Sequence, residues 1–141
     1  MKDERIMPKA VHVSDAIASL PMLRNRTPET QGPEADAAFA MLAETRDGGV
    51  FAGSFEGESA WERHVNGDEL VHVLDGETRL TILSGNGPTV LEMKAGMLTV
   101  VPQGCWHKFH ARSGVTVLTV TPQPTDHSTA DDPTQVGSET G

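Results

Sequence analysis

Two β-type segments, residues 69–74 and 77–83, flank the dipeptide Asp75-Gly76 and constrain the fold most strongly. Asp-Gly is a preferred two-residue hairpin turn because both central residues adopt positive φ. Side chains alternate across a strand. The predicted hairpin therefore has one core face, formed by Glu69, Val71, Val73, Thr78, Leu80 and Ile82. This register buries Glu69 among apolar residues, where a carboxylate without a partner is costly.

In the rest of residues 36–121, short β-type segments are separated by turn residues, as is typical of an all-β domain. Short strands are predicted at residues 89–94, 97–101, 106–111 and 115–120, with Gly or Pro in the turns between them. Residues 39–45 are interpreted as a strand that forms a hairpin with residues 50–55 across Arg46-Asp47-Gly48-Gly49, although the sequence from Asp36 could also begin a helix.

The segments on either side of this domain lack its pattern of regular strands. Residues 1–35 are predicted to be a lead-in with a short strand at residues 11–13, followed by a Pro-rich loop over residues 21–34. Residues 122–141 form an acidic tail with little apolar surface to offset its ordering entropy, so we predict disorder there.

Composition narrows the class of protein. The 141 residues carry a net charge of -9, which argues against nucleic-acid binding and against anionic membrane surfaces. No apolar run is long enough to cross a bilayer, and the first residues do not resemble a secretory signal. The single Cys105 forms no internal disulfide and is typical of the reducing cytoplasm.

Two short motifs contain the side chains that bind metals. Glu62, His64 and Glu69 belong to the first, and His107 follows Pro102-Gln103-Gly104-Cys105-Trp106 in the second. Glu62 and His64 are two positions apart, so both point the same way on an extended segment. Two imidazoles and two carboxylates inside one barrel would make a site for a divalent transition metal.

At these residues the chain resembles the small single-domain cupins of the cupin superfamily. Their first motif reads Gly, five residues, His-x-His, three or four residues, Glu, six residues, Gly. This chain matches it at His64, Glu69 and Gly76, but Glu62 stands where the first His belongs. Gly57, as the leading glycine, sits one residue too close. The second motif is matched by Gly96, Pro102, Gly104 and His107, and Ala111 replaces its final Asn.

The resemblance implies an antiparallel barrel of the double-stranded β-helix, or jelly-roll, type and a homodimer. It implies a metal held by Glu62, His64, Glu69 and His107, with Fe, Mn, Zn or Ni as the ion. A small organic molecule is the expected substrate, and dioxygenase, isomerase or lyase chemistry is implied. The alternative is a non-enzymatic barrel that binds a small ligand, because no separate acid–base pair stands out.

Other polar and aromatic residues are assigned less specific roles. His72 and His110 point to the opposite face of their strands from Glu69 and His107, so both are excluded as ligands. Cys105 is expected to pack as a small hydrophobe. His12 and His127 receive no role. Arg24 and Arg26 could meet an acidic ligand, although exposed charge is their simpler interpretation. Trp61 and Trp106 are expected to pack, and the inner wall is expected to consist of Val71, Val73, Leu80, Ile82 and Phe109.

Overall fold

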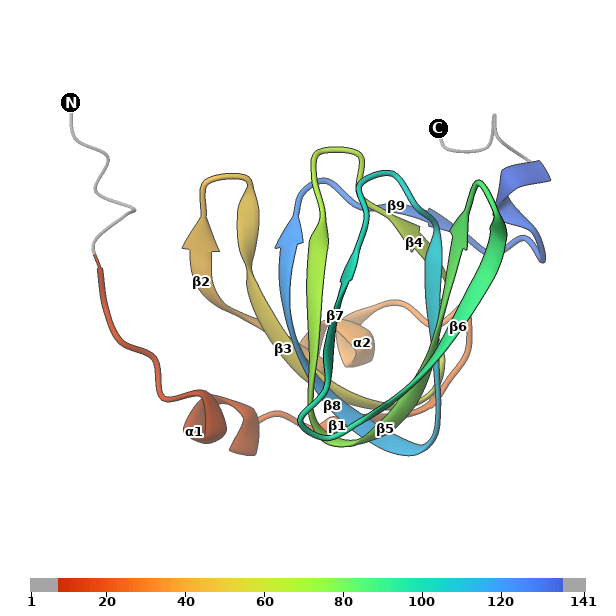
Figure 1. Cartoon of the computed structure of the whole chain (residues 1–141). Helices are drawn as coiled ribbons and strands as arrows, with labels where there is room; N and C mark the ends of the chain where they lie inside the picture. Colours follow the sequence, from red (N-terminus) through yellow and green to blue (C-terminus); the bar gives the residue numbers. More distant parts are fainter. Residues whose placement is uncertain (1–7, 136–141) are drawn as a thin grey trace.

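The computed structural model describes residues 8–135, which form a single β-barrel with two short helices (Figure 1). The predicted jelly-roll architecture is confirmed. In chain order the elements are α1 (Val13–Ala18), β1 (Met22–Arg26), α2 (Pro33–Ala38), β2 (Phe39–Thr45), β3 (Gly48–Glu58), β4 (Trp61–Arg63), β5 (Glu69–Ser84), β6 (Gly87–Lys94), β7 (Leu98–Val101), β8 (His107–Pro122) and β9 (Asp126–Ser128).

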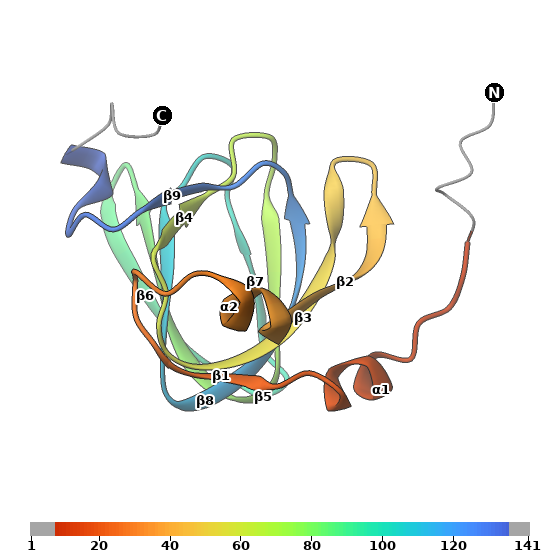
Figure 2. The same ribbon diagram turned by 180° about the vertical axis from the view of Figure 1, so that it is seen from behind.

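Strand β8 is the centre of the sheet. It pairs antiparallel with β3, with β5 and, near its start, with β4. Strand β5 adds β7 along its first part and β6 along its second part. Strand β2 pairs with β3, which confirms the predicted hairpin of residues 39–55. Seen from behind, α2 lies across the barrel and β1 runs below it (Figure 2).

The predicted hairpin at Asp75-Gly76 is wrong, because β5 runs without a turn from Glu69 to Ser84. Register shifts against β8 fall between Val73 and Asp75 and between Gly76 and Arg79. These irregularities reverse the alternation of side chains, just as a two-residue turn would. The predicted core face is therefore correct although the turn is not: all six of its residues are buried, Glu69 among them.

A similar correction applies to residues 106–120. The two strands predicted there are one strand, β8, which continues through Gly114 at a φ of 111°. A register shift in β3 lies opposite this point, between Phe55 and Gly57. Glycine here bends a long strand and does not end it.

The N-terminal flank is more ordered than predicted. Residues 11–13 do not form a strand: His12 caps α1 by accepting the backbone N–H of Asp15. The predicted Pro-rich loop contains β1, which pairs in parallel with β3. It also contains the start of α2, where Pro33 occupies the first turn. Proline is tolerated there because its missing N–H would have no partner inside the helix.

The prediction of disorder after residue 121 is wrong for part of the tail. Strand β9 pairs with β4, Arg63 and Asp126 form an ion pair of 2.8 Å, and Pro133 is fully buried. These contacts stabilise a segment that has little apolar surface of its own. Residues 136–141 lie outside the described residues. The domain limits of 36 and 121 remain a prediction, although β1 and β9 pair with barrel strands from beyond them.

The core lies on the inner face of the folded sheet. It is apolar and includes the five residues predicted for the inner wall, Val71, Val73, Leu80, Ile82 and Phe109. Phe55 packs edge-on against Phe109, with ring centroids 5.7 Å apart. Neither helix within residues 8–135 has the length and apolarity that crossing a bilayer requires.

Gly76 should be needed for the bend in β5. Its φ is 76°, and a Cβ at this position would lie 2.3 Å from the carbonyl oxygen of Gly114. We expect Gly76→Ala to lower the free energy of unfolding by about 2–4 kcal/mol in urea denaturation. The control is Gly85→Ala, whose Cβ would meet nothing within 4 Å. Equal stability of the two variants would contradict this account of β5.

Candidate metal centre

Strand β4 brings Glu62 between two histidines. It lies between β8 and β9, and Glu62 stands directly opposite His107 on β8 and His127 on β9. Directly opposed side chains of neighbouring strands are close enough to interact. His107 is fully buried, whereas the His127 side chain is 60% exposed and its Nε2 lies 3.6 Å from Glu62 Oε2.

His64 comes directly after β4, where the loops of the two sequence motifs are joined by hydrogen bonds. The backbone N–H of Gly104 donates to the carbonyl oxygen of His64 at 2.9 Å. Gln103 donates its backbone N–H to Asp68 Oδ1 and its side-chain amide to the carbonyl of Val65, both at 2.8 Å. The turn before His107 is thereby held against the segment that contains His64.

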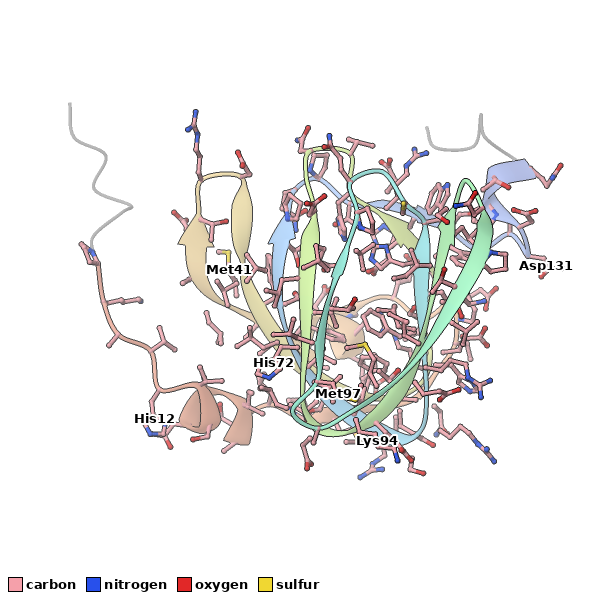
Figure 3. The ribbon with its side chains drawn as sticks, in the orientation of Figure 1. His12, Met41, His72, Lys94, Met97 and Asp131 are labelled. Carbon is pink, nitrogen blue, oxygen red and sulfur yellow. The ribbon has the colours of Figure 1, made fainter. Side chains whose placement is uncertain are left out.

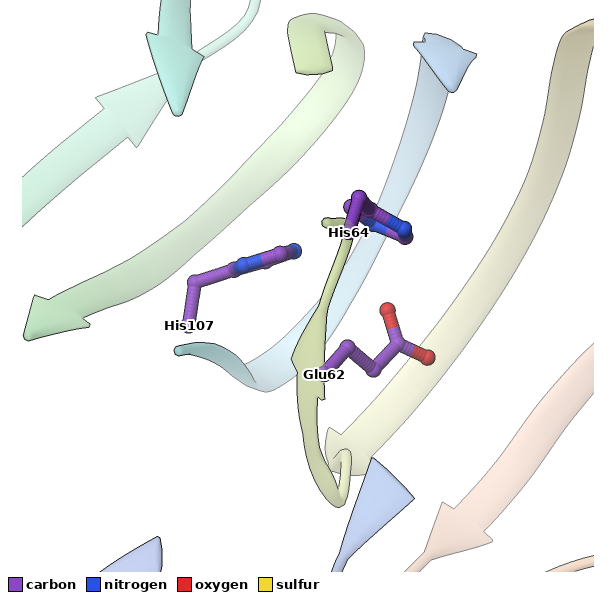
Figure 4. A group of neighbouring side chains, drawn as sticks. All are labelled: Glu62, His64 and His107. Carbon is purple, nitrogen blue, oxygen red and sulfur yellow. The ribbon is translucent and has the colours of Figure 1, made fainter. Parts of the chain in front are cut away.

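Three ligand atoms come together at this point. One atom each from Glu62, His64 and His107 lie within 4.8 Å of one another. Glu62 and His64 project to the same side of their segment (Figure 4), as the two-residue spacing predicts. The ring centroids of His64 and His107 are 5.2 Å apart.

Glu69, at the start of β5, contacts both imidazoles. Its Oε1 lies 2.9 Å from His107 Nε2 and 3.3 Å from His64 Nε2. Neither contact has hydrogen-bond geometry, so all three buried atoms are without a hydrogen-bond partner among residues 8–135. The other carboxylate oxygen, Oε2, accepts the hydroxyl of Thr121 at 2.6 Å. Buried polar atoms are rarely left in this way, and each such case calls for an explanation.

The hydrogen bond at the other ring nitrogen determines what His107 presents to Glu69. His107 Nδ1 lies 3.0 Å from the carbonyl oxygen of Cys105, which can only accept, so Nδ1 donates. In the neutral imidazole, Nε2 then presents a lone pair toward Glu69 Oε1, which is also an acceptor. Two acceptors 2.9 Å apart need a cation, either a proton on the imidazole or a metal ion beside both atoms.

The same contacts shift the pKa values of the site. Burial alone would raise the pKa of Glu69, but the contacts with His107 and His64 outweigh it and lower the pKa to about 2. Burial opposes a charge on His107, yet the Glu69 carboxylate raises the pKa of His107 above its ordinary value. Burial also acts to raise the pKa of Glu62, and the contact with His127 reverses this, so that the pKa is lowered. Both carboxylates are therefore ionised at neutral pH.

The structure brings together all four residues predicted as ligands: Glu62, His64, Glu69 and His107. Carboxylate oxygen and imidazole nitrogen suit divalent transition metals, and the three atoms without hydrogen-bond partners point toward one another. These residues therefore fit a metal ion, with Glu62, His64 and His107 as a possible three-residue site.

The residues excluded from the site lie elsewhere. His110 is exposed, and His72 is a half-buried residue on the outward face of β5, opposite Leu98. Figure 3 shows His72 on the outside of the barrel and His12 beside α1. Cys105 packs against the core cluster, as predicted for a small hydrophobe. Trp61 and Trp106 are buried and pack beneath Lys108 and Arg63.

Sequence reasoning missed the contribution of β9. Thr125 Oγ1 lies 3.1 Å from His64 Nδ1, and His127 contacts Glu62. The composition of this tail indicates disorder, and no local pattern indicates that residues 126–128 pair with β4. The pairing depends on long-range contacts such as the ion pair of Arg63 with Asp126, which the sequence does not specify by spacing.

A pocket of about 190 Å³ opens beside the four residues. Glu62, His64 and Glu69 lie in its wall, together with Arg26, Thr119, Thr121 and all four phenylalanines of the chain, Phe39, Phe51, Phe55 and Phe109. Of the five residues predicted for the inner wall, only Phe109 lines this pocket. The other four are packed inside the core, because the β2–β3 hairpin and β1 supply the wall instead.

Comparison with known proteins agrees with this fold. Residues 54–121 match the family model of the Cupin domain, and this part of the chain is a cupin domain. The sequence comparison with curated proteins gives no match. Among solved structures, a cupin-2 domain containing protein from Shewanella frigidimarina has a TM-score of 0.58 and 18% identity, with coverage of 85% of this chain and 97% of that one.

Two further similar structures are hydroquinone 1,2-dioxygenases. The enzyme from Sphingomonas sp. TTNP3, with 4-hydroxybenzoate bound, has a TM-score of 0.56 and 15% identity, covering 80% of this chain and 73% of that one. PnpCD, in complex with Cd²⁺ and 4-hydroxybenzonitrile, has a TM-score of 0.51 and 22% identity, covering 60% of this chain and 63% of that one. At these identities the likeness shows the fold.

Proposed function

We propose that this cupin binds a divalent transition metal through Glu62, His64, Glu69 and His107 and uses it to act on a small organic molecule. The observation that carries the proposal is the set of three buried atoms, Nε2 of both histidines and Oε1 of Glu69, that face one another without a hydrogen bond among the described residues. A metal ion would accept electron density from all three and remove the repulsion between acceptors.

The presence of Glu62 in place of a histidine affects the choice of ion. Two carboxylates cancel the charge of a divalent ion, whereas three imidazoles and one carboxylate would leave one positive charge. A neutral site favours ions that tolerate oxygen ligands, so we propose Fe, Mn, Zn or Ni. It also makes the bound ion a weaker Lewis acid than in a site with one carboxylate.

Dioxygenation is the reaction that the pocket supports best. Isomerases and lyases move a proton at carbon and need a positioned acid or base. Beyond the predicted ligands, the polar side chains that line the pocket within residues 8–135 are Arg26, threonines and Gln123. An iron ion, when bound, supplies oxygen chemistry without such a group, and two similar folds are named dioxygenases. The protein itself would bind the substrate, orient it and exclude water.

The second candidate is a barrel that binds a small ligand without turnover. It is favoured by the same composition of the pocket wall, since binding needs apolar surface and a few polar contacts but no acid or base. Ligand-induced stabilisation without any product would support this function over the enzymatic one. A location in the cytoplasm remains our prediction from the single Cys105.

The first test is the metal content of protein purified without a histidine tag. We expect wild type to hold close to one equivalent of Fe, Mn, Zn or Ni by plasma mass spectrometry. His107→Ala should lose that metal, because it removes a fully buried ligand. The matched control is His110→Ala, which removes an exposed imidazole three residues further along β8 and should retain the metal. A wild type that takes no metal after reconstitution would contradict the proposal.

The Thr125 hydroxyl should orient His64 for the metal. It lies 3.1 Å from Nδ1, so it fixes the ring with Nε2 toward Glu69. Loss of such a contact to a ligating histidine weakens metal binding by about 10- to 100-fold. We expect this decrease for Thr125→Val in a competition titration with a fluorescent chelator. The control is Thr134→Val, an exposed position of the same tail. Equal affinities for both variants would mean that Thr125 does not support the site.

We propose a homodimer formed through the outer face of the sheet. Four neighbouring strands place Val100, Leu70, Val120 and Val50 in one row across this face. Leu98 and Val100 on β7 are 59% and 48% exposed. Exposed apolar residues gathered on one face are typical of a protein interface.

Light scattering after size-exclusion chromatography measures this directly. Wild type should have twice the 15.1 kDa mass of the chain. The double variant Leu98→Asp and Val100→Asp should have the mass of the monomer, because it buries charge at the interface. Val90→Asp, at an exposed position of β6 outside the row, should remain dimeric. A monomeric wild type would contradict the dimer.

A further inference from the structure

Among residues 8–135, Arg26 is the only lysine or arginine that lines the pocket beside the candidate metal centre. Its guanidinium carbon lies 4.6 Å from the ring centroid of Phe55 and 5.3 Å from that of Phe39. Cation–π contacts of this kind hold a guanidinium flat on an aromatic wall and leave its N–H groups at the edge. Arg26 is therefore part of the wall of the pocket.

The backbone around Arg26 fixes its position. Arg26 is paired with Gly57 at the end of β1, and a Cβ on Gly57 would lie 2.3 Å from the carbonyl oxygen of Arg26. Asn25 has a left-handed φ of 56°, and its N–H donates to Glu56 Oε1 at 3.0 Å. Such a conformation is uncommon for a residue other than glycine. It turns the chain at Arg26, and the neighbouring Arg24 is exposed.

The guanidinium lacks a close partner within the described part of the chain. None of the carboxylates of residues 8–135 lies within the 4.0 Å of an ion pair with it, although the charge of Glu62 acts on it from further away. Burial of the guanidinium lowers the pKa of Arg26 below its ordinary value. An arginine in such a place presents paired donors that match a carboxylate.

The charges of the pocket select the ligand. With a divalent ion balanced by Glu62 and Glu69, Arg26 leaves one positive charge, which a single carboxylate neutralises. The four phenylalanines offer a wall for a ring, and the 190 Å³ of the pocket exceeds the roughly 150 Å³ that holds a benzene molecule. We propose that the pocket takes a small aromatic carboxylate, with the carboxylate on Arg26 and the ring among the phenylalanines. This inference rests on the proposed metal site for its charge balance.

The test compares benzoate with benzamide, its neutral isostere, by calorimetric titration of manganese-loaded protein. Wild type should bind benzoate at least about tenfold more tightly than benzamide, as expected for a charged hydrogen-bonded pair. Arg26→Gln should lose this preference, and Arg26→Lys should keep part of it because it keeps the charge. The matched control is Arg24→Gln, two residues earlier on the same strand, which should behave as wild type. Thermal melting confirms that each variant is folded.

Metal content is measured on the same samples, so the two proposals can fail separately. Equal binding of benzoate and benzamide by metal-loaded wild type would overturn the role of Arg26 and leave the metal site standing. If Arg26→Gln still prefers benzoate to benzamide, the role of Arg26 is likewise overturned. If the protein takes no metal, the proposed function fails, and the same titrations are made without metal. A preference for benzoate over benzamide that depends on Arg26 would then still support a carboxylate ligand at Arg26. The absence of that preference would overturn it.

Discussion

The contact between Glu69 and two buried imidazoles is the interaction on which the rest of the site depends. One oxygen of this carboxylate lies within 3.3 Å of both Nε2 atoms, and none of the three atoms completes a hydrogen bond within residues 8–135. A buried carboxylate costs several kcal/mol unless it is paired. In a barrel with an apolar core, such an arrangement is stabilised by a cation at the point where these atoms meet.

The fold supplies this arrangement from three separated parts of the chain. Strand β5 places Glu69 on the core face, β8 places His107 opposite Glu62, and the hydrogen bond of Gly104 to His64 joins the two motif loops. Strand β9 then pairs with the far side of β4 and contributes His127, and Thr125 directly before it contacts His64. The N-terminal β1 adds Arg26 to the wall of the pocket. The flanks thus complete a site whose centre belongs to the cupin domain of residues 54–121.

Short-range patterns predicted the centre of the structure but not its edges. The alternation around Asp75-Gly76 predicted the correct core face for the wrong reason, because a bulged strand and a two-residue turn shift the phase of the side chains equally. The spacing of Glu62 and His64 predicted that they point the same way, and the resemblance to cupins implied that Glu69 and His107 join them. The contacts of Thr125 and His127 were not predictable, since they depend on β9, a strand of three residues that pairs far away in the sequence. The sequence allowed an acidic ligand at Arg26 but did not predict that β1 brings this residue into the pocket wall. Composition also gave a wrong prediction of disorder for part of the tail. Pairing with β4 and the burial of Pro133 order this segment, although it has little apolar surface.

The most direct test of the account is X-ray diffraction from crystals of manganese-loaded protein, with an anomalous difference map calculated at a wavelength near the manganese edge. The account predicts one strong peak within about 2.0–2.3 Å of ligand atoms from Glu62, His64, Glu69 and His107. A map without a peak at this point, with Glu69 hydrogen-bonded to a protonated His107 instead, would contradict it.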